Sequence, residues 1–371
     1  MSRPAKALID LDALRHNVAL ANKLAPQSRN MAIVKANAYG HGVLPVARAI
    51  EDLVPAFGVA CIEEALELRE GGIAKPVCLL EGAFCADEID IAAEQGFWLS
   101  VVNREQLEAI LNARPPRPVR VWLWVDSGMH RLGLRPEEVV AAYGALSSCA
   151  HVDPQVVVAT HFACADELDN DFTTEQLARL NAGMAGLVSD SPVPLSLANS
   201  AALLGWPVCR AAWNRPGIML YGSTPFSGPH ETGDQLLPVM TLRSSVIALR
   251  DVPAGETVGY AARWIARRPS RIATVAIGYG DGYPVHAPDG TPVLVKGQRC
   301  PMVGRVSMDM ITVDVTGLPE VSVGDEVILW GRGLSVNEVA DWVGTISYEL
   351  LTRMPRRVPR VYVDATSELW R

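Results

Sequence analysis

The sequence predicts an α/β fold in two parts, an N-terminal (β/α)8 barrel of the TIM type over residues 1–232 and a mostly β-strand domain over residues 233–371. From Met31 onward, eight short apolar runs are each followed by a helical run, which is the pattern of a closed parallel barrel. The apolar runs are continuous, as expected of strands buried on both faces. After residue 232 the strands are separated by turn residues, which indicates a second domain.

The barrel elements follow one another in a regular order after an opening strand-like run over 7–11. Apolar and β-branched runs predict strands over 31–36, 57–62, 77–80, 97–102, 119–125, 156–160, 194–199 and 211–215. Amphipathic runs between them predict helices over 43–52, 62–70, 86–94, 104–111, 136–146, 172–188 and 201–204. The last strand leads into a short turn over 216–222.

The second domain reads as strands joined by tight turns. Its apolar runs predict strands within 239–249, 271–283, 291–304, 309–315 and 325–331, with turn signals such as Asp289-Gly290 and Lys296-Gly297 between them. Two helical runs over 335–343 and 347–354 follow, and a last strand over 358–364 ends the pattern.

Composition narrows the class of protein. Apolar residues make up 49% and charged residues 20% of the chain, the balance of a soluble globular enzyme. A net charge of −8 without a basic block argues against nucleic acid as a partner. No apolar run is long enough to cross a bilayer and no secretion signal is visible, so a cytoplasmic protein is expected. Seven cysteines without a CxxC pair predict neither a disulfide framework nor a metal site.

Lysine chemistry must come from a short list, because the chain has only five lysines. Lys35 follows four apolar residues inside a predicted strand, and a buried ammonium is costly unless it is paired or deprotonated. A desolvated lysine with a lowered pKa is a Schiff-base nucleophile. Position alone leaves open that its stem reaches solvent at the barrel mouth. The other four lie in polar or turn segments: Lys6, Lys23, Lys75 and Lys296.

More polar residues follow other predicted barrel strands. Arg131, His161 and Arg215 come after the fifth, sixth and eighth strands, and reactive groups in this fold gather at such strand ends. A histidine in this place can equally be a hydrogen-bonded core residue. We expect these side chains to share one barrel mouth with Lys35.

An anion site is predicted where Pro216 and Gly217 begin a short helix, whose free N–H groups lie at a positive dipole end. Ser200, just after the seventh strand, could add a hydroxyl. Loops after strands seven and eight often hold phosphate in barrels. Helix capping by Asn199 and Pro216 accounts for the same pattern and is compatible with it.

Six motifs in order along nearly the whole chain resemble those of the bacterial alanine racemases. They are VKANAYGHG (34–42), DSGMHRLG (126–133), RPGIMLYG (215–222), VGY (258–260), GYGDGYP (278–284) and VGRVSMDM (303–310). The resemblance implies the barrel and β-rich domain already predicted from the pattern. It also implies an isomerase that uses pyridoxal phosphate to interconvert L-alanine and D-alanine, with D-alanine biosynthesis and alanine catabolism both open as its role.

Residue roles follow from the resemblance position by position. Lys35 would hold the cofactor covalently and act as base on the D enantiomer, and Tyr260 would take the proton from the L enantiomer. The other implied roles are cofactor binding by Tyr39, His161, Ser200, Arg215, Gly217 and Ile218, substrate binding by Arg131 and Met308, and lining of the entrance by Tyr279 and Tyr348. In the family, Tyr260, Tyr279, Met308 and Tyr348 come from the partner subunit, so a homodimer with two shared sites is expected.

One position departs from the family pattern. The family often has a carbamylated lysine two residues before the aspartate of the 126–133 motif, where it pairs with the substrate-binding arginine. This chain has Trp124, which offers one N–H and no charge. Arg131 must then be oriented by a small anion, by water or by another side chain.

Two rival functions fit parts of the pattern. A decarboxylase on the same two-domain plan would carry a different C-terminal signature with a functional cysteine, and the motifs around Tyr260 and Met308 argue against it. A pyridoxal-phosphate carrier without activity would resemble the barrel but lack the second domain. Release of carbon dioxide from an amino acid would favour the decarboxylase. Binding of the cofactor without turnover would favour the carrier.

Overall fold

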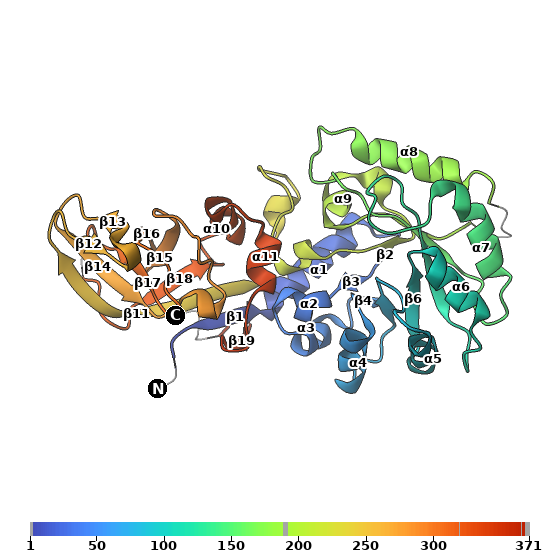
Figure 1. Cartoon of the computed structure of the whole chain (residues 1–371), viewed down its shortest axis with the longest axis horizontal. Coiled ribbons are helices and arrows are strands. Elements are labelled where there is room, and N and C mark those ends of the chain that lie inside the picture. Colours follow the sequence, from blue (N-terminus) through green and yellow to red (C-terminus); the bar gives the residue numbers. More distant parts are fainter. Residues whose placement is uncertain (1–2, 188–191, 319, 365, 368–371) are drawn as a thin grey trace.

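The computed structural model describes residues 3–187, 192–318, 320–364 and 366–367. It is elongated, with a helix-ringed barrel at one end and an antiparallel sheet at the other (Figure 1). The predicted α/β class, a TIM-type barrel followed by a mostly β-strand region, is confirmed.

The barrel sheet is parallel throughout and closed. Its first strand is split into two successive segments, and pairing of the last strand with the first of these segments closes the ring. In spatial order the strands are β2 (Arg29–Asn30), β10 (Trp213–Asn214), β9 (Leu195–Ser196), β8 (Val157–Ala159), β7 (Arg120–Trp124), β6 (Phe97–Val101), β5 (Val77–Leu79), β4 (Phe57–Val59) and β3 (Ala32–Ile33).

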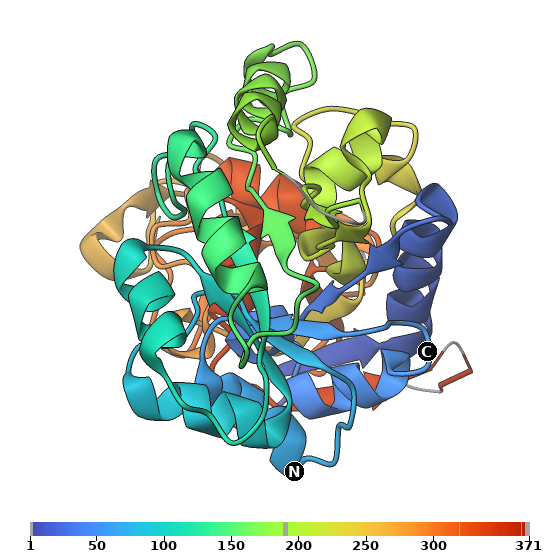
Figure 2. The same ribbon diagram turned by 90° about the vertical axis from the view of Figure 1, so that its right-hand side faces the viewer.

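Helices surround this sheet, as Figure 2 shows. They are α3 (Val43–Ile50), α4 (Ile62–Glu70), α5 (Ala86–Gln95), α6 (Arg104–Asn112), α7 (Val139–Ser147), α8 (Phe172–Met184) and α9 (Ser200–Gly205). The predicted helix over 172–188 ends at Met184, and its last residue lies outside the described residues. Helix α1 (Leu11–Leu24) was not predicted, although Asp10 caps it by accepting from the N–H groups of Asp12 and Ala13.

The second sheet has eight strands, with β14 also pairing with β11. In spatial order they are β14 (Ser270–Val275), β17 (Ile311–Asp314), β16 (Gln298–Val303), β15 (Pro292–Val295), β18 (Glu326–Trp330), β11 (Met240–Val252), β1 (Lys6–Asp10) and β19 (Arg360–Val363). A separate hairpin joins β12 (Thr257–Val258) to β13 (Trp264–Ile265).

Strand β1 belongs to this second sheet, whereas the predicted division placed residues 1–232 with the barrel. It pairs antiparallel with β11 and parallel with β19. The pairing buries Ala7, Leu8 and Ile9 in the core, and this burial is the physical reason why β1 lies in the second sheet. The chain therefore enters the second sheet first, builds the barrel, and then returns.

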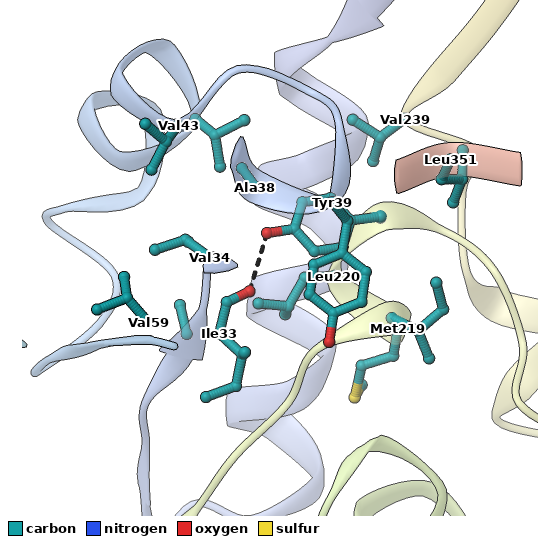
Figure 3. Packing of buried hydrophobic residues seen from close by; sticks show 14 of the residues in the cluster. Ile33, Val34, Ala38, Tyr39, Val43, Val59, Met219, Leu220, Val239 and Leu351 are labelled. Carbon is teal, nitrogen blue, oxygen red and sulfur yellow. Dashed lines mark hydrogen bonds between the residues drawn. The ribbon is translucent and has the colours of Figure 1, made fainter. Parts of the chain in front are cut away.

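Two helices, α10 (Val336–Val343) and α11 (Ser347–Thr352), lie between the sheets (Figure 1). Helix α11 packs on α2 (Lys35–Tyr39). Figure 3 shows Tyr39, Leu220 and Leu351 gathered around the strand end at Ile33, whose carbonyl accepts the Tyr221 hydroxyl at 2.9 Å (dashed line). The C-terminal helices are thus fixed against the barrel mouth.

Hydrogen bonds reinforce this contact. The Ser223 hydroxyl lies 2.7 Å from the Ser347 hydroxyl and 2.8 Å from the Asn337 side-chain oxygen. In the described segments, no helix is long and apolar enough to span a membrane. All seven cysteines are free thiols.

Candidate active site

A cavity of about 500 Å³ opens at the C-terminal ends of the barrel strands. Its walls come mainly from the segments that follow β3, β5, β7, β8, β9 and β10, with α11 closing one side. Nine of the twelve predicted site residues line it: Lys35, Tyr39, Arg131, His161, Ser200, Arg215, Gly217, Ile218 and Tyr348.

The turn that carries Lys35 is left-handed. From Ala36 to Tyr39, four consecutive residues have φ between 50° and 54°. Such a conformation costs about 1–2 kcal/mol for each residue other than glycine. It persists only where the surroundings determine it, and such strain concentrates at functional sites. The sequence predicted only a tight loop here, because alanine and tyrosine rarely adopt the left-handed conformation.

Two side chains that sequence reasoning missed hold this turn. The buried His41 places Nδ1 at 3.0 Å from the Ala38 carbonyl and 2.9 Å from the Tyr39 carbonyl. Burial lowers its pKa to about 4, so the ring is neutral and Nδ1–H donates. One oxygen of Glu64, from α4, accepts the N–H of Ala36 at 2.7 Å, and the other accepts a backbone N–H after β4. These bonds fix the backbone next to Lys35.

The Lys35 side chain reaches the cavity with no hydrogen-bond or ion-pair partner among the described residues. Burial lowers its pKa, and the positive charges of Arg131 and Arg215 lower it further, while Glu81 opposes the shift. More of this amine is therefore neutral near pH 7 than in an exposed lysine. A neutral amine is both a nucleophile and a base.

Arg215 is buried beside the cavity and is held firmly. Its Nη1 donates to the carbonyl and hydroxyl of Ser196 at 2.8 and 2.7 Å, and Nη2 donates to the Thr160 carbonyl at 2.6 Å. No carboxylate in the described part of the chain pairs with it. Burial lowers its pKa to about 10, which still leaves it charged at neutral pH. The bonds leave Nε without an acceptor among the described residues.

His161 stands beside this cation. Its Nδ1 lies 3.4 Å from Nη2 of Arg215, which can only donate, so Nδ1 accepts. Burial lowers the pKa of His161 to about 3, and the charges of Arg215, Arg131 and Lys35 act in the same direction. The imidazole is therefore neutral over the physiological range.

A cradle of donors lies on another wall. The Ser200 hydroxyl accepts the N–H of Gly217 at 2.8 Å, while the N–H of Ile218 has no acceptor within the described residues. A Cβ at residue 217 would lie 2.6 Å from the Tyr39 hydroxyl oxygen, so glycine is needed there. Burial raises the pKa of Tyr39 to about 12, which keeps this hydroxyl a donor. Two hydroxyls and a free amide suit an oxyanion.

A buried amide joins two of these strand ends. Gln176 of α8 donates to the His161 carbonyl at 3.0 Å and to the Ser127 hydroxyl at 3.2 Å. The Thr160 hydroxyl donates to the Val125 carbonyl at 2.8 Å, so Ser127 must donate to Thr160. The proton direction is fixed along the whole chain of bonds. Sequence reasoning missed Gln176, which lies on a helix far from any motif.

Arg131 is exposed and has no ion-pair or hydrogen-bond partner among residues that the structure describes. Trp124 does not hold it. The indole N–H of Trp124 donates to the Ser100 hydroxyl at 2.9 Å, and its ring lies 4.8 Å from the guanidinium carbon of Arg215. No described side chain therefore takes over the orienting role that was left open for Arg131.

Three predicted residues lie away from the cavity, on loops of the second domain. Tyr260, Tyr279 and Met308 are 70%, 42% and 54% exposed and do not line the cavity of their own chain. The N–H of Tyr279 donates to the Ser307 carbonyl at 3.0 Å, and the N–H of Gly280 donates to the Met308 carbonyl at 2.9 Å. Hydrogen bonds therefore join the loop that bears Tyr279 to the loop that bears Met308.

Tyr348 requires a correction, because the expectation that a partner subunit supplies it is wrong. Its ring lies 6.2 Å from that of Tyr39, and it lines the cavity of its own chain. The physical reason is the packing of α11 on α2, where the α-carbon of Gly40 fits directly against the Leu351 carbonyl.

The fold and this cavity define a two-domain enzyme, a (β/α)8 barrel with its site at the strand ends and an attached β domain. Family models described as "Alanine racemase, N-terminal domain" and "Alanine racemase, C-terminal domain" match residues 9–225 and 239–362. The chain belongs to the alanine racemase family, as its motifs indicated, and is an amino-acid racemase.

Close relatives support the assignment over the full length. An alanine racemase of Chromohalobacter salexigens is 52% identical, with 98% of this chain and 99% of that protein covered. An alanine racemase of Pseudomonas fluorescens is 51% identical, with 98% of this chain and 99% of that protein covered. The crystal structure of the biosynthetic alanine racemase from Pseudomonas aeruginosa superimposes with a TM-score of 0.93 at 49% identity, covering 98% of this chain and 100% of that one.

Proposed function

We propose that this protein interconverts L-alanine and D-alanine with pyridoxal phosphate bound covalently at Lys35, and that Tyr260 of the partner subunit is the second base. The observation that carries the proposal is the cavity itself. It presents one partly buried lysine of lowered pKa between a guanidinium and a set of free oxyanion donors. A lysine of shifted pKa that lies in a cleft beside charged groups is a candidate for a catalytic role.

The residues fit the cofactor at each end. Ser200, Tyr39 and the amides of Gly217 and Ile218 would hold the phosphate. The Ile218 amide has no described acceptor, whereas the Gly217 amide donates to the Ser200 hydroxyl at 2.8 Å and would turn from it to the phosphate. Arg215 would meet the ring nitrogen through Nε, the guanidinium nitrogen that has no acceptor among the described residues. When bound, pyridoxal phosphate supplies the electron sink for the carbon from which a proton leaves.

Two bases explain why two domains are needed. Racemisation removes a proton from one face of the α-carbon and returns one to the opposite face. Lys35 serves the face toward the barrel. Tyr260, exposed on the second domain of the same chain, cannot reach that cavity, so a neighbouring copy in a homodimer supplies the phenol. Cationic groups near the cavity lower the cost of a phenolate there.

The substrate carboxylate is recognised by groups that lack partners in the single chain. Arg131 has no described counter-charge, and the N–H of Met308 has no described acceptor. In the homodimer they bind the carboxylate together, with Tyr279 of the partner and Tyr348 of the same chain narrowing the entrance. Alanine fits this space best and serine is a slower substrate, because an extra small group costs only about 1–3 kcal/mol.

Arg215 restrains side reactions. An arginine cannot protonate the ring nitrogen as a carboxylic acid would, so Arg215 would make the bound cofactor a weaker electron sink. Arg215→Glu should raise the fraction of turnovers that convert the cofactor to its amine form. An unchanged ratio of the two products would count against this role.

The direct test is chemical fixation. Purified protein loaded with pyridoxal phosphate is reduced with borohydride, and the tagged peptide is identified by mass spectrometry. The tag is expected on Lys35. A tag on Lys6, Lys23, Lys75 or Lys296 would overturn the assignment. Racemisation of alanine without carbon dioxide release, measured on the same sample, separates this function from decarboxylation and from carriage of the cofactor.

A further inference from the structure

The buried cation of Arg215 lacks an acidic partner. Its hydrogen-bond acceptors in the described chain are uncharged: the carbonyls of Thr160, Ser196 and Leu197, a hydroxyl and an imidazole. Neutral acceptors satisfy the donors, but they leave a full positive charge in a desolvated place, where charge is costly. Some other group must offset that charge.

Trp124 is the group in position to do so. Its ring centre lies 4.8 Å from the guanidinium carbon of Arg215, and a tryptophan face attracts a cation most strongly where water is excluded. The side chain is only 7% exposed, and its N–H is anchored on the fully buried Ser100 at 2.9 Å. The ring also lies 6.4 Å from that of His161. Its orientation is therefore fixed against Arg215.

We propose that Trp124 is a positioning residue for Arg215, that its ring face offsets the buried charge, and that its bond to Ser100 directs the free Nε into the cavity. The inference rests on the proposed function, in which Nε meets the cofactor ring. It also accounts for why Trp124, whose N–H is bonded to Ser100, leaves Arg131 unpaired among the described residues.

The test compares Trp124→Phe, which keeps a ring face, with Trp124→Leu, which removes it. The readouts are the dissociation constant of pyridoxal phosphate and the visible absorption maximum of the bound cofactor. Trp124→Phe should keep most of the affinity. Trp124→Leu should weaken it by about tenfold to thirtyfold and shift the maximum. If Trp124→Leu does not fold, Trp124→Met serves in its place.

Trp98 provides a matched control. It is 8% exposed, and the guanidinium carbon of Arg120 lies 5.0 Å from its ring, at the opposite end of the barrel from the cavity. Trp98→Leu removes a contact of the same kind and should lower the melting temperature without moving the absorption maximum. Equal affinity and equal spectra in Trp124→Leu and Trp124→Phe would overturn the inference.

Failure of the proposed function gives a different result. If wild-type protein takes up no pyridoxal phosphate, the proposed function is refuted, and the contact is then measured in the cofactor-free protein. A double-mutant cycle of Trp124→Leu and Arg215→Met on the melting temperature should show coupling between the two side chains. Additive effects would refute the role of Trp124.

Discussion

The barrel mouth and the loop face of the second domain differ in how complete they are. At the mouth, Arg215, His161, Ser200 and the turn after Lys35 are buried or bonded on several sides. On the second domain, Tyr260 and Met308 are more than half exposed and border no cavity of their own chain. The half of the site that we propose holds the cofactor is preorganised in one chain, whereas the half that would complete it faces outward. The barrel mouth should therefore be sensitive to local changes in packing, whereas the loop face of the second domain should depend on whether two chains associate.

The largest effect is expected at the mouth. Lys35→Ala removes the proposed covalent attachment point, which is also one of the two proposed bases, so racemisation should fall by at least about 10⁴-fold. Alanine interconversion is measured by chiral chromatography. Lys296→Ala, on an exposed hairpin, is the control and should retain full activity. Residual activity above about a hundredth in Lys35→Ala would contradict a unique role for that amine.

Tyr260→Phe tests the outward half. Racemisation should fall by about 10²–10⁴-fold, because one of the two proposed bases is lost. Lys35 remains, so D-alanine should still exchange its α-hydrogen in deuterated water, which proton NMR measures. The buried Tyr143, in α7, is the control as Tyr143→Phe. Equal loss of exchange and racemisation would remove the two-base account.

His41 makes the barrel side sensitive to acid. Its pKa is lowered to about 4 in the folded state from 6.5 in the unfolded chain, so its contribution to stability is complete above pH 6.5 and is lost as pH falls toward 4. That contribution is about 3 kcal/mol by linkage. Denaturant unfolding of wild type and His41→Asn over this range should show a shallower pH slope in the variant.

The control for His41 comes from the other region. His286 is exposed on the second domain, so His286→Asn should leave the pH slope of wild type unchanged. Identical slopes in wild type and His41→Asn would mean that His41 does not titrate differently on folding.

The smallest effect on activity is expected from a substitution in the ion pairs beneath the loop that bears Tyr279. The fully buried Asp281 pairs with Arg3 at 2.6 Å and with Arg357 at 2.9 Å. Arg3→Met leaves the second arginine, so stability should fall by only about 1–2 kcal/mol, with a few-fold rise in KM for alanine and no change in cofactor affinity. Arg250→Met on an exposed strand is the control. A weakened cofactor affinity would show that the two halves are not separable.

How much the sequence predicts depends on the range of the forces involved. The helix over 62–70 was predicted to the residue, because its apolar spacing and acidic first turn are local signals. The motifs predicted nine residues that now line one cavity. The left-handed turn could not be predicted, since contacts from His41 and Glu64 impose it against the preference of its residues.

Long-range partners were also beyond the sequence. Gln176 is an ordinary helical residue until the fold brings Ser127 and the His161 carbonyl to it. The place of Tyr348 depends on α11 meeting α2 across some 300 positions of chain, a contact that no local pattern encodes.

The placement of β1 has a consequence for biosynthesis on the ribosome. The strand emerges first, but its two neighbours are β11 and β19, so one of its edges stays unpaired until β11 has been made and the other until the last strand, β19, has been made. An open edge is a template for pairing with other chains. Truncated products that end after the barrel should therefore self-associate, and removing residues 3–10 from such fragments should restore their solubility.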